Sequence, residues 1–170
     1  MTASDEMALA IGRMTMAWSR VHFGLYELLI YISDLDERDA RRGEFFRGSE
    51  DWRKREVVEQ AFLACLGAAH PLSLRLGSAL TRCRDLANKR NAFIHTPLFE
   101  MEHVSRVEPL GGIHPGEVWG PDRSDRYQIK SDALAECQEL RREIEEVEDM
   151  ITDIIDEAII ARMAARVTRP

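Results

Sequence analysis

Long apolar runs are missing from this sequence. No run approaches the roughly eighteen apolar residues that a membrane-spanning helix needs, so we expect no transmembrane segment and no membrane partner. The chain starts with MTASDEMALAIGRM, which is acidic and amphipathic and lacks the basic start and apolar block of a secretory signal. We therefore expect a cytoplasmic protein.

Cysteine is scarce, and the usual patterns of metal ligands are absent. The 3 cysteines are Cys65, Cys83 and Cys137, with no CxxC or CxxH spacing, and each falls among apolar neighbours. This placement predicts buried thiols rather than metal ligands or nucleophiles. No Glu-x-x-His lies on a predicted helix, which excludes a di-metal carboxylate bundle, and GGIHPG lacks the glycine–lysine pair of a phosphate loop. We expect no metal and no cofactor.

The composition that remains is that of an ordinary globular protein. The 170 residues are 45% apolar and 31% charged, which favours one folded domain over residues 1–170. The net charge of −7 argues against nucleic acid binding over the whole surface, although the distribution of charge matters more than its sum.

Apolar residues recur with heptad spacing in two long segments. The first seam runs from Met7 to Leu35 and predicts a helix over about residues 5–34, and the second runs from Cys137 to Ala161, after a cap at Ser131. Two shorter helices are predicted between them, one from Ser49 or Asp51 to Gly67 and one from Pro71 to about His95.

The remaining segments contain turn residues and charges. DLDERDARRGEFFRGSED, residues 34–51, is interpreted as a loop that Phe45 and Phe46 hold to the bundle, and residues 98–130 as a small β-hairpin or ordered loop. The sequence therefore predicts an all-α protein: a four-helix, up-and-down bundle with a small β-hairpin or ordered loop inserted before the last long helix.

The first helix carries more apolar surface than one seam requires. Phe23, Tyr26, Leu29 and Ile30 lie off the seam. Such extra surface covers either the hairpin or a second copy of the chain, and we expect a homodimer.

Charge is distributed unevenly between the last two predicted helices. Residues 131–160 hold eleven acidic and two basic side chains, which is typical of a solvated helix face. Residues 72–95 hold five basic side chains and one acidic one. We therefore expect a positive patch on this helix, where Arg82, Arg84 and Lys89 contact RNA phosphates.

The stretch RNAFIH, from Arg90 to His95, lies within that patch. Arg90 occupies an inward-tending seam position, and Asn91 and His95 share one helical face. Cleavage of RNA by its own 2′-hydroxyl needs a base near neutral pH and a cation for the phosphorane. Histidine and arginine supply these, while asparagine fixes the imidazole tautomer or holds a phosphate oxygen. No metal is needed.

A purely structural interpretation of the same three residues is also open. Arg90 would donate to carbonyls at the helix end or pair with an acidic residue of the last helix. Asn91 would bond the backbone of the hairpin, and His95 would cap the helix. Such a network would hold residues 98–130 to the bundle.

RNAFIH resembles the R-x4-H motif of the HEPN superfamily (higher eukaryotes and prokaryotes nucleotide-binding), including the polar residue after the arginine. LANKRNAFIHTPLF is similar to a group of uncharacterised bacterial helical-bundle proteins that carry KRN…H. The resemblance implies a metal-independent endoribonuclease site, composite across a dimer, with Arg90 and His95 catalytic and Asn91 supporting.

Two other functions remain open at this point. One is a catalytically silent HEPN-like module that binds RNA, a nucleotide or a protein, for instance one half of a toxin–antitoxin or defence pair with an antitoxin protein as its partner. The other is a purely structural helical dimer, which makes no use of the basic patch.

Overall fold

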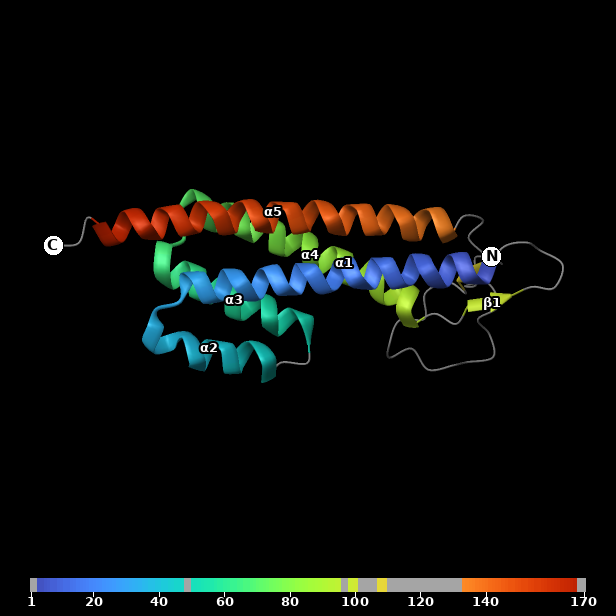
Figure 1. The fold of residues 1–170 in the computed structure, drawn as a ribbon, viewed down its shortest axis with the longest axis horizontal. Coiled ribbons are helices and arrows are strands. Elements are labelled where there is room, and N and C mark those ends of the chain that lie inside the picture. The colour runs from blue at the N-terminus through green and yellow to red at the C-terminus, as the bar shows by residue number, and fades with distance from the viewer. Residues whose placement is uncertain (1–2, 48–49, 96–97, 101–106, 110–132, 168–170) are drawn as a thin grey trace. The chain divides into compact units, whose positions relative to one another are not determined.

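The computed structural model describes residues 3–47, 50–95, 98–100, 107–109 and 133–167 (Figure 1). The elements, in chain order, are α1 (Ala3–Ile32), α2 (Leu35–Arg47), α3 (Asp51–Leu66), α4 (Pro71–His95), β1 (Leu98–Glu100), β2 (Val107–Pro109) and α5 (Ala133–Val167). The all-α fold class is confirmed. β1 and β2 pair antiparallel, with Phe99 opposite Glu108, and the other residues of the predicted insertion at 98–130 lie outside the described residues.

The chain forms two compact units. Unit 1 comprises Met1–Ala17 and Asp85–Ile144, and unit 2 comprises Trp18–Arg84 and Glu145–Pro170. The helices α1, α4 and α5 each contribute to both units, whereas α2 and α3 belong to unit 2.

The heptad seams form the core, as their spacing predicts. In unit 1, Met14 of α1 and Cys137 of α5 are fully buried, with their sulfur atoms 4.0 Å apart. In unit 2, all five helices contribute buried residues, and the largest fully buried ones are Val21, Leu25, Leu28, Leu29, Val58, Phe62, Leu76, Ile151 and Ile154. Burial of each large apolar side chain contributes about 1.5–3 kcal/mol, so the seams account for most of the stabilisation.

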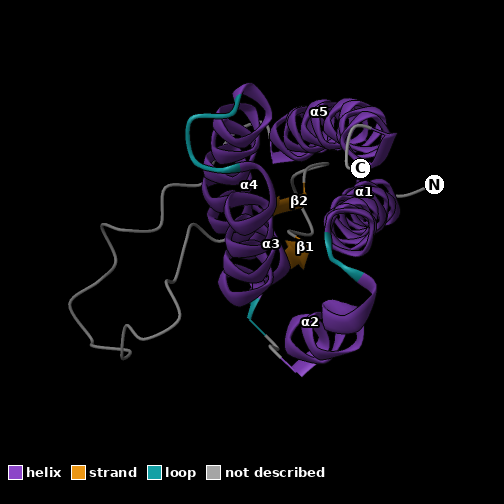
Figure 2. Ribbon diagram, turned by 90° about the vertical axis from the view of Figure 1, so that its left-hand side faces the viewer, coloured by secondary structure: helices purple, strands orange, loops and turns teal. Residues whose placement is uncertain are grey.

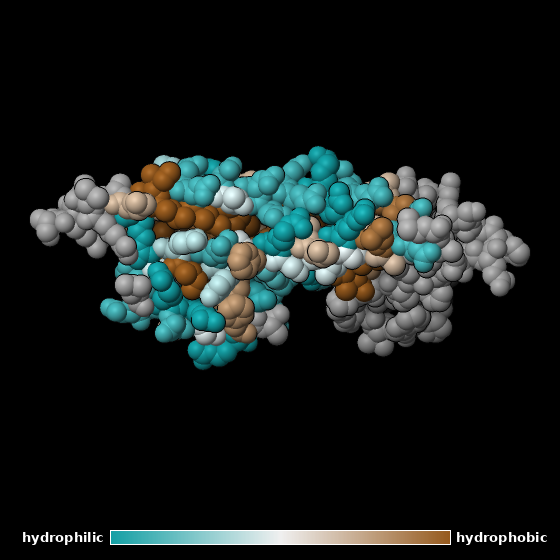
Figure 3. All heavy atoms as spheres, in the orientation of Figure 1, coloured by the Kyte–Doolittle hydropathy of each residue, from teal (hydrophilic) through white to brown (hydrophobic). Residues whose placement is uncertain are grey.

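Helices α1 and α5 lie side by side and run in the same direction (Figure 1). In unit 2, Arg20 Nε of α1 donates to Glu148 of α5 at 2.8 Å. Directly after the C-terminal end of α1, the Ser33 carbonyl accepts from Arg162 Nη1 of α5 at 2.7 Å. Between these points a Cβ on Gly24 would lie 3.0 Å from Ile151 Cγ2, so the glycine allows a close approach. Figure 3 shows a hydrophobic strip between the two helices toward their C-terminal ends.

The predicted loop at residues 34–51 is wrong, because most of it forms α2. This helix docks through Phe45, which is 2% exposed and whose ring lies 5.7 Å from that of Tyr26 in α1 and 5.9 Å from Lys54 Nζ in α3. An ion pair between Glu37 and Arg41, four residues apart, supports it locally at 2.8 Å. Figure 2 shows α2 beside α1 and α3 in unit 2.

The extra apolar surface of α1 is partly covered by this additional helix. Leu29 is fully buried, and Tyr26 contacts both Phe45 and Phe46 of α2, whereas Phe23 stays 61% exposed. Part of the surface that predicted a dimer is therefore occupied within the chain itself.

The helix α2 also reverses the direction of the helices that follow it in the chain. In a four-helix up-and-down bundle the first and last helices are antiparallel. The described residues instead form five helices, and the additional reversal at α2 makes α5 run parallel to α1. The prediction of four up-and-down helices is therefore wrong in helix number and in the direction of the last helix.

The connection between α3 and α4 agrees with its turn residues. Gly67 ends α3 with φ +84°, and its N–H donates to the Leu63 carbonyl at 2.9 Å. Pro71 begins α4, where the Leu72 N–H donates to His70 Nδ1 at 3.2 Å. None of the helices in the described part of the chain is long and apolar enough to cross a membrane.

Candidate functional site

The RNAFIH stretch forms the last turns of α4. Leu86 and Ala87 are buried and continue the α4 seam, and Arg90 and Phe93 on the same stripe are half-buried. The helix ends at His95, as predicted, because the residue before a proline is disfavoured in the helical region. The side chain of His95 lies outside the described residues.

The Arg90 guanidinium is held by its neighbour. Arg90 Nε and Nη2 both donate to Asn91 Oδ1, at 3.1 and 2.5 Å, and both side chains are half-buried. Asn91 Oδ1 therefore accepts from arginine, while the role of asparagine in fixing the imidazole or holding a phosphate stays a prediction. A guanidinium held in this way loses less side-chain freedom when it binds an anion.

Two of the predicted phosphate ligands, Lys89 and Arg82, pair with glutamates of α5. Lys89 Nζ lies 2.7 Å from Glu143 Oε2, and Arg82 Nη2 lies 2.8 Å from Glu146 Oε2. Arg75, one heptad before Arg82, pairs with Glu157 at 2.5 Å. The third ligand, Arg84, is exposed on α4.

These ion pairs join the basic face of α4 to the acidic face of α5. Each is solvent-exposed and contributes at most about 1 kcal/mol. The ion pairs matter more for the electrostatic field at the α4 surface than for stability, because the carboxylates of α5 offset the positive charge that the sequence of α4 predicts. The seven-residue spacing of Arg75, Arg82 and Lys89 is the sequence signal that indicates pairing along a helix interface.

A hydrogen-bonded carboxylate lies beside this row. Glu139 accepts from Arg142 Nε at 3.0 Å. This bond, with a smaller contribution from the charge of Lys89, lowers the pKa of the exposed Glu139 carboxyl below its ordinary value. The α5 surface near Lys89 therefore stays anionic at neutral pH.

The cysteines only partly match their prediction. Cys83 and Cys137 are buried, and burial raises the pKa of each thiol to about 11, which keeps both neutral at physiological pH. Cys65 is exposed on α3, so its predicted burial is wrong. It lies in the last turn of the helix, where the seam no longer faces the core.

The structure also places a histidine and two tryptophans. His22 Nε2 lies 3.2 Å from Asp51 Oδ1 and joins α1 to α3 in unit 2. Trp18 is buried, whereas Trp52 at the start of α3 is half-exposed. Among the described residues, no three histidine, cysteine or acidic side chains gather closely enough to hold a metal ion.

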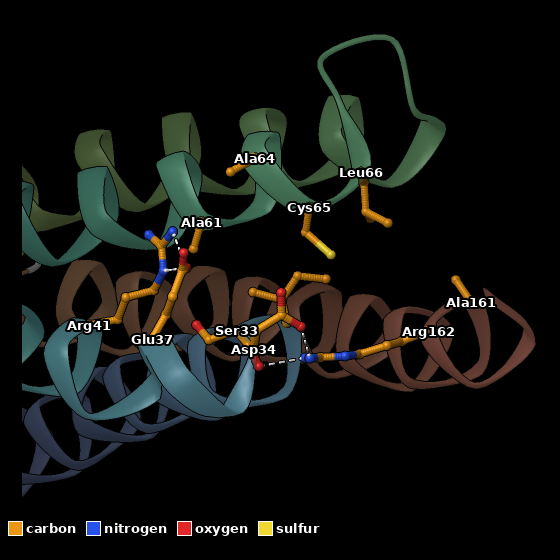
Figure 4. Close-up of a pocket in the computed structure, with 11 residues that line it drawn as sticks. Ser33, Asp34, Glu37, Arg41, Ala61, Ala64, Cys65, Leu66, Ala161 and Arg162 are labelled. Carbon is orange, nitrogen blue, oxygen red and sulfur yellow. Dashed lines mark hydrogen bonds and ion pairs between the residues drawn. The ribbon is translucent and has the colours of Figure 1, made fainter. Parts of the chain in front are cut away.

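A pocket of about 280 Å³ lies in unit 2 where α1 ends, lined also by α2, α3 and α5 (Figure 4). Its charged side chains are paired: Arg162 Nη2 donates to Asp34 Oδ1 at 2.8 Å, and Arg41 Nη2 donates to Glu37 Oε2 at 2.8 Å. Cys65 contributes the only thiol among its lining residues. The ion pairs leave no net charge for a ligand, so this pocket is a weaker candidate than the end of α4.

Comparison of the chain with protein-family models, curated proteins and solved structures found no match.

Proposed function

We propose that the chain is a HEPN-like, metal-independent endoribonuclease that acts through Arg90, Asn91 and His95. The observation that supports this proposal is the Arg90 guanidinium, half-buried in the last turns of α4 and held at two nitrogens by Asn91 Oδ1. A preorganised cation next to the place where charge develops is the largest single contribution in many hydrolytic sites.

The proposed reaction uses the 2′-hydroxyl of RNA as the nucleophile. The imidazole of His95 removes the 2′-hydroxyl proton, and the 2′-oxygen attacks the adjacent phosphorus. Arg90 stabilises the phosphorane, and the P–O5′ bond breaks as a protonated histidine returns a proton to the leaving oxygen. The products are a 2′,3′-cyclic phosphate and a 5′-hydroxyl. In a homodimer the two copies of His95 serve as base and acid.

A catalytically silent HEPN-like module is the second candidate, and one observation favours it. Arg82 and Lys89, which would hold RNA phosphates, are paired with carboxylates of α5. An RNA strand would have to displace these carboxylates or bind elsewhere. In this case the chain would bind RNA, a nucleotide or an antitoxin-like protein without cutting RNA.

The two candidates are separated by cleavage assays on purified variants. Wild type should cut single-stranded RNA in the presence of EDTA and leave cyclic phosphate ends. His95→Ala should lose roughly 10²–10⁴-fold in rate, and Arg90→Ala roughly 10²–10³-fold. Asn91→Ala should lose less, because it only orients Arg90.

The matched control is Arg75→Gln, which removes a cation from the same helix. Arg75 pairs with Glu157 and lies outside the proposed site, so its rate should equal that of wild type. Far-UV circular dichroism and thermal unfolding separate a catalytic role from a structural one. Full helicity with no cleavage by wild type, or equal rates for wild type and His95→Ala, would overturn the nuclease proposal.

A further inference from the structure

Two cations of α2, Arg38 and Arg42, differ from Arg75, Arg82 and Lys89 of α4 in having no carboxylate partner among the described residues. In unit 2, Arg38 Nε is buried and makes no hydrogen bond. Arg42, one turn further along α2, is exposed and takes part in no hydrogen bond or ion pair with the described residues. Arg75, Arg82 and Lys89 of α4 are each bound to a glutamate of α5.

One exposed aromatic ring lies on the same side of α2 as these two arginines, and a second lies on α1. Phe46 follows Arg42 by four residues, so Arg38, Arg42 and Phe46 fall on one side of α2. Phe46 is 61% exposed, and its ring lies 5.0 Å from that of Tyr26 in α1. Phe23, three residues before Tyr26 on α1, is equally exposed. We name these five residues the α2 shelf.

The α2 shelf is costly for the protein when nothing is bound. Two arginines four residues apart repel each other and destabilise the helix slightly. A buried guanidinium nitrogen without a partner loses its hydration without compensation. A large aromatic side chain that remains exposed gives up most of the stabilisation that its burial would add. An anionic ligand with flat apolar faces would relieve the repulsion between the arginines and the exposure of the rings.

We propose that the α2 shelf binds single-stranded RNA, with phosphates on Arg38 and Arg42 and unstacked bases on the rings of Phe46 and Phe23. Arginine forks match phosphate oxygens, and aromatic rings stack on any base. A duplex keeps its bases stacked on each other and cannot use the rings. The helix α2 also carries the exposed acidic residues Asp36, Asp39 and Glu44, which limit the positive field at the shelf.

The choice of RNA as ligand rests on the proposed function, but the α2 shelf is separate from Arg90 and His95. Arg38, Arg42 and Phe46 belong to α2, which lies in unit 2, whereas Arg90 and His95 belong to unit 1. The shelf therefore offers RNA contacts that the neutralised face of α4 lacks.

Binding is measured by fluorescence anisotropy with a short labelled single-stranded RNA of mixed sequence, in a His95→Ala background that prevents cleavage. Arg38→Gln with Arg42→Gln should weaken binding and reduce the salt dependence, by roughly 1.4 in the slope of log affinity against log salt. Phe46→Ala should weaken binding roughly 5–150-fold. The same sequence as a duplex should bind less tightly than the single strand.

Two matched controls carry the same changes on other faces. Arg20→Gln with Arg75→Gln removes two exposed arginines that are paired with Glu148 and Glu157. Leu74→Ala removes an apolar side chain on α4 that is 66% exposed. Both should bind RNA as the background does. Circular dichroism confirms that each variant is folded.

Three results would overturn the proposal that the α2 shelf binds RNA. The first is no RNA binding at low salt, and the second is equal RNA affinities for the shelf variants and the control variants. The third is that the shelf variants lose affinity for an acidic peptide but bind RNA as tightly as the background does. Failure of the shelf is distinguishable from failure of the nuclease. If wild type cleaves RNA and the shelf variants bind RNA as the background does, only the shelf proposal is refuted. If RNA binds through the shelf and wild type does not cleave it, only the nuclease proposal is refuted.

Discussion

Gly24 of α1 offers a sharp test of how closely α1 packs against α5. A Cβ added at Gly24 would lie 3.0 Å from Ile151 Cγ2, whereas a Cβ added at Gly77 of α4 would meet nothing within 4 Å. Both glycines are helical and belong to unit 2. The pair therefore separates intrinsic helix propensity from contact with α5.

The two substitutions should change the free energy of unfolding differently. Replacing glycine by alanine in an exposed helix stabilises by about 0.8–1.0 kcal/mol, and Gly77→Ala should show this gain. Gly24→Ala should receive the same gain but lose about 1–3 kcal/mol to overpacking against Ile151. We expect Gly24→Ala to be neutral or destabilising and to unfold at a lower urea concentration than Gly77→Ala.

Urea unfolding followed by circular dichroism measures both variants under the same conditions. The slope of the unfolding free energy against urea should be equal in wild type and both variants, so that midpoints can be compared directly. If Gly24→Ala stabilises as much as Gly77→Ala, α5 does not lie against Gly24. The close packing of α1 against α5 at Gly24 would then be refuted.

Three further expectations concern α2 and the thiols. Phe45→Ala should destabilise by about 3–5 kcal/mol in urea unfolding, whereas Phe46→Ala should have a small effect because the ring is 61% exposed; equal effects would mean that α2 does not dock through Phe45. Under native conditions a thiol reagent should label Cys65, and labelling of buried Cys83 or Cys137 at a similar rate would contradict their burial. Burial raises the pKa of Cys83 from 9.0 to about 11. The contribution of the neutral buried thiol to the free energy of unfolding is therefore fully present below pH 9 and falls by up to about 2 kcal/mol toward pH 11. Cys83→Ala should make the unfolding free energy fall less than that of wild type across this range, and an identical fall would refute the assignment.

The sequence predicts the long helices because their seams are regular. The α4 boundaries follow from Pro71 and from the proline after Thr96, and the α5 seam is buried along its length. Regular heptad spacing and proline chemistry act locally, so they can be recognised without knowing the fold.

The helix α2 could not be predicted in the same way. Its sequence, LDERDARRGEFFR, is mostly charged and contains a glycine, so it lacks an apolar stripe. The helix is stable because Phe45 fits between Tyr26 and Lys54, two residues from other helices. Such tertiary contacts override local preference, and the sequence does not show them.

The sequence predicts that the RNAFIH stretch ends α4, but it does not predict the contacts of that stretch. Adjacent residues on a helix do not normally face each other, so the bond from Arg90 to Asn91 is not expected from spacing. The pairing of Lys89 with Glu143 depends on the register between α4 and α5. Register is fixed by packing of the whole bundle, and the charge pattern alone leaves it open.

The parallel direction of α1 and α5 has an electrostatic consequence. The peptide dipoles of two parallel helices add, so the partial negative charges at neighbouring C-terminal ends repel each other. Arg162 of α5 donates to the Ser33 carbonyl and to Asp34, directly after the last turn of α1. The helix whose direction creates the repulsion thus also carries the counter-charge for its neighbour, and loss of this arginine would leave the C-terminal end of α1 more negative.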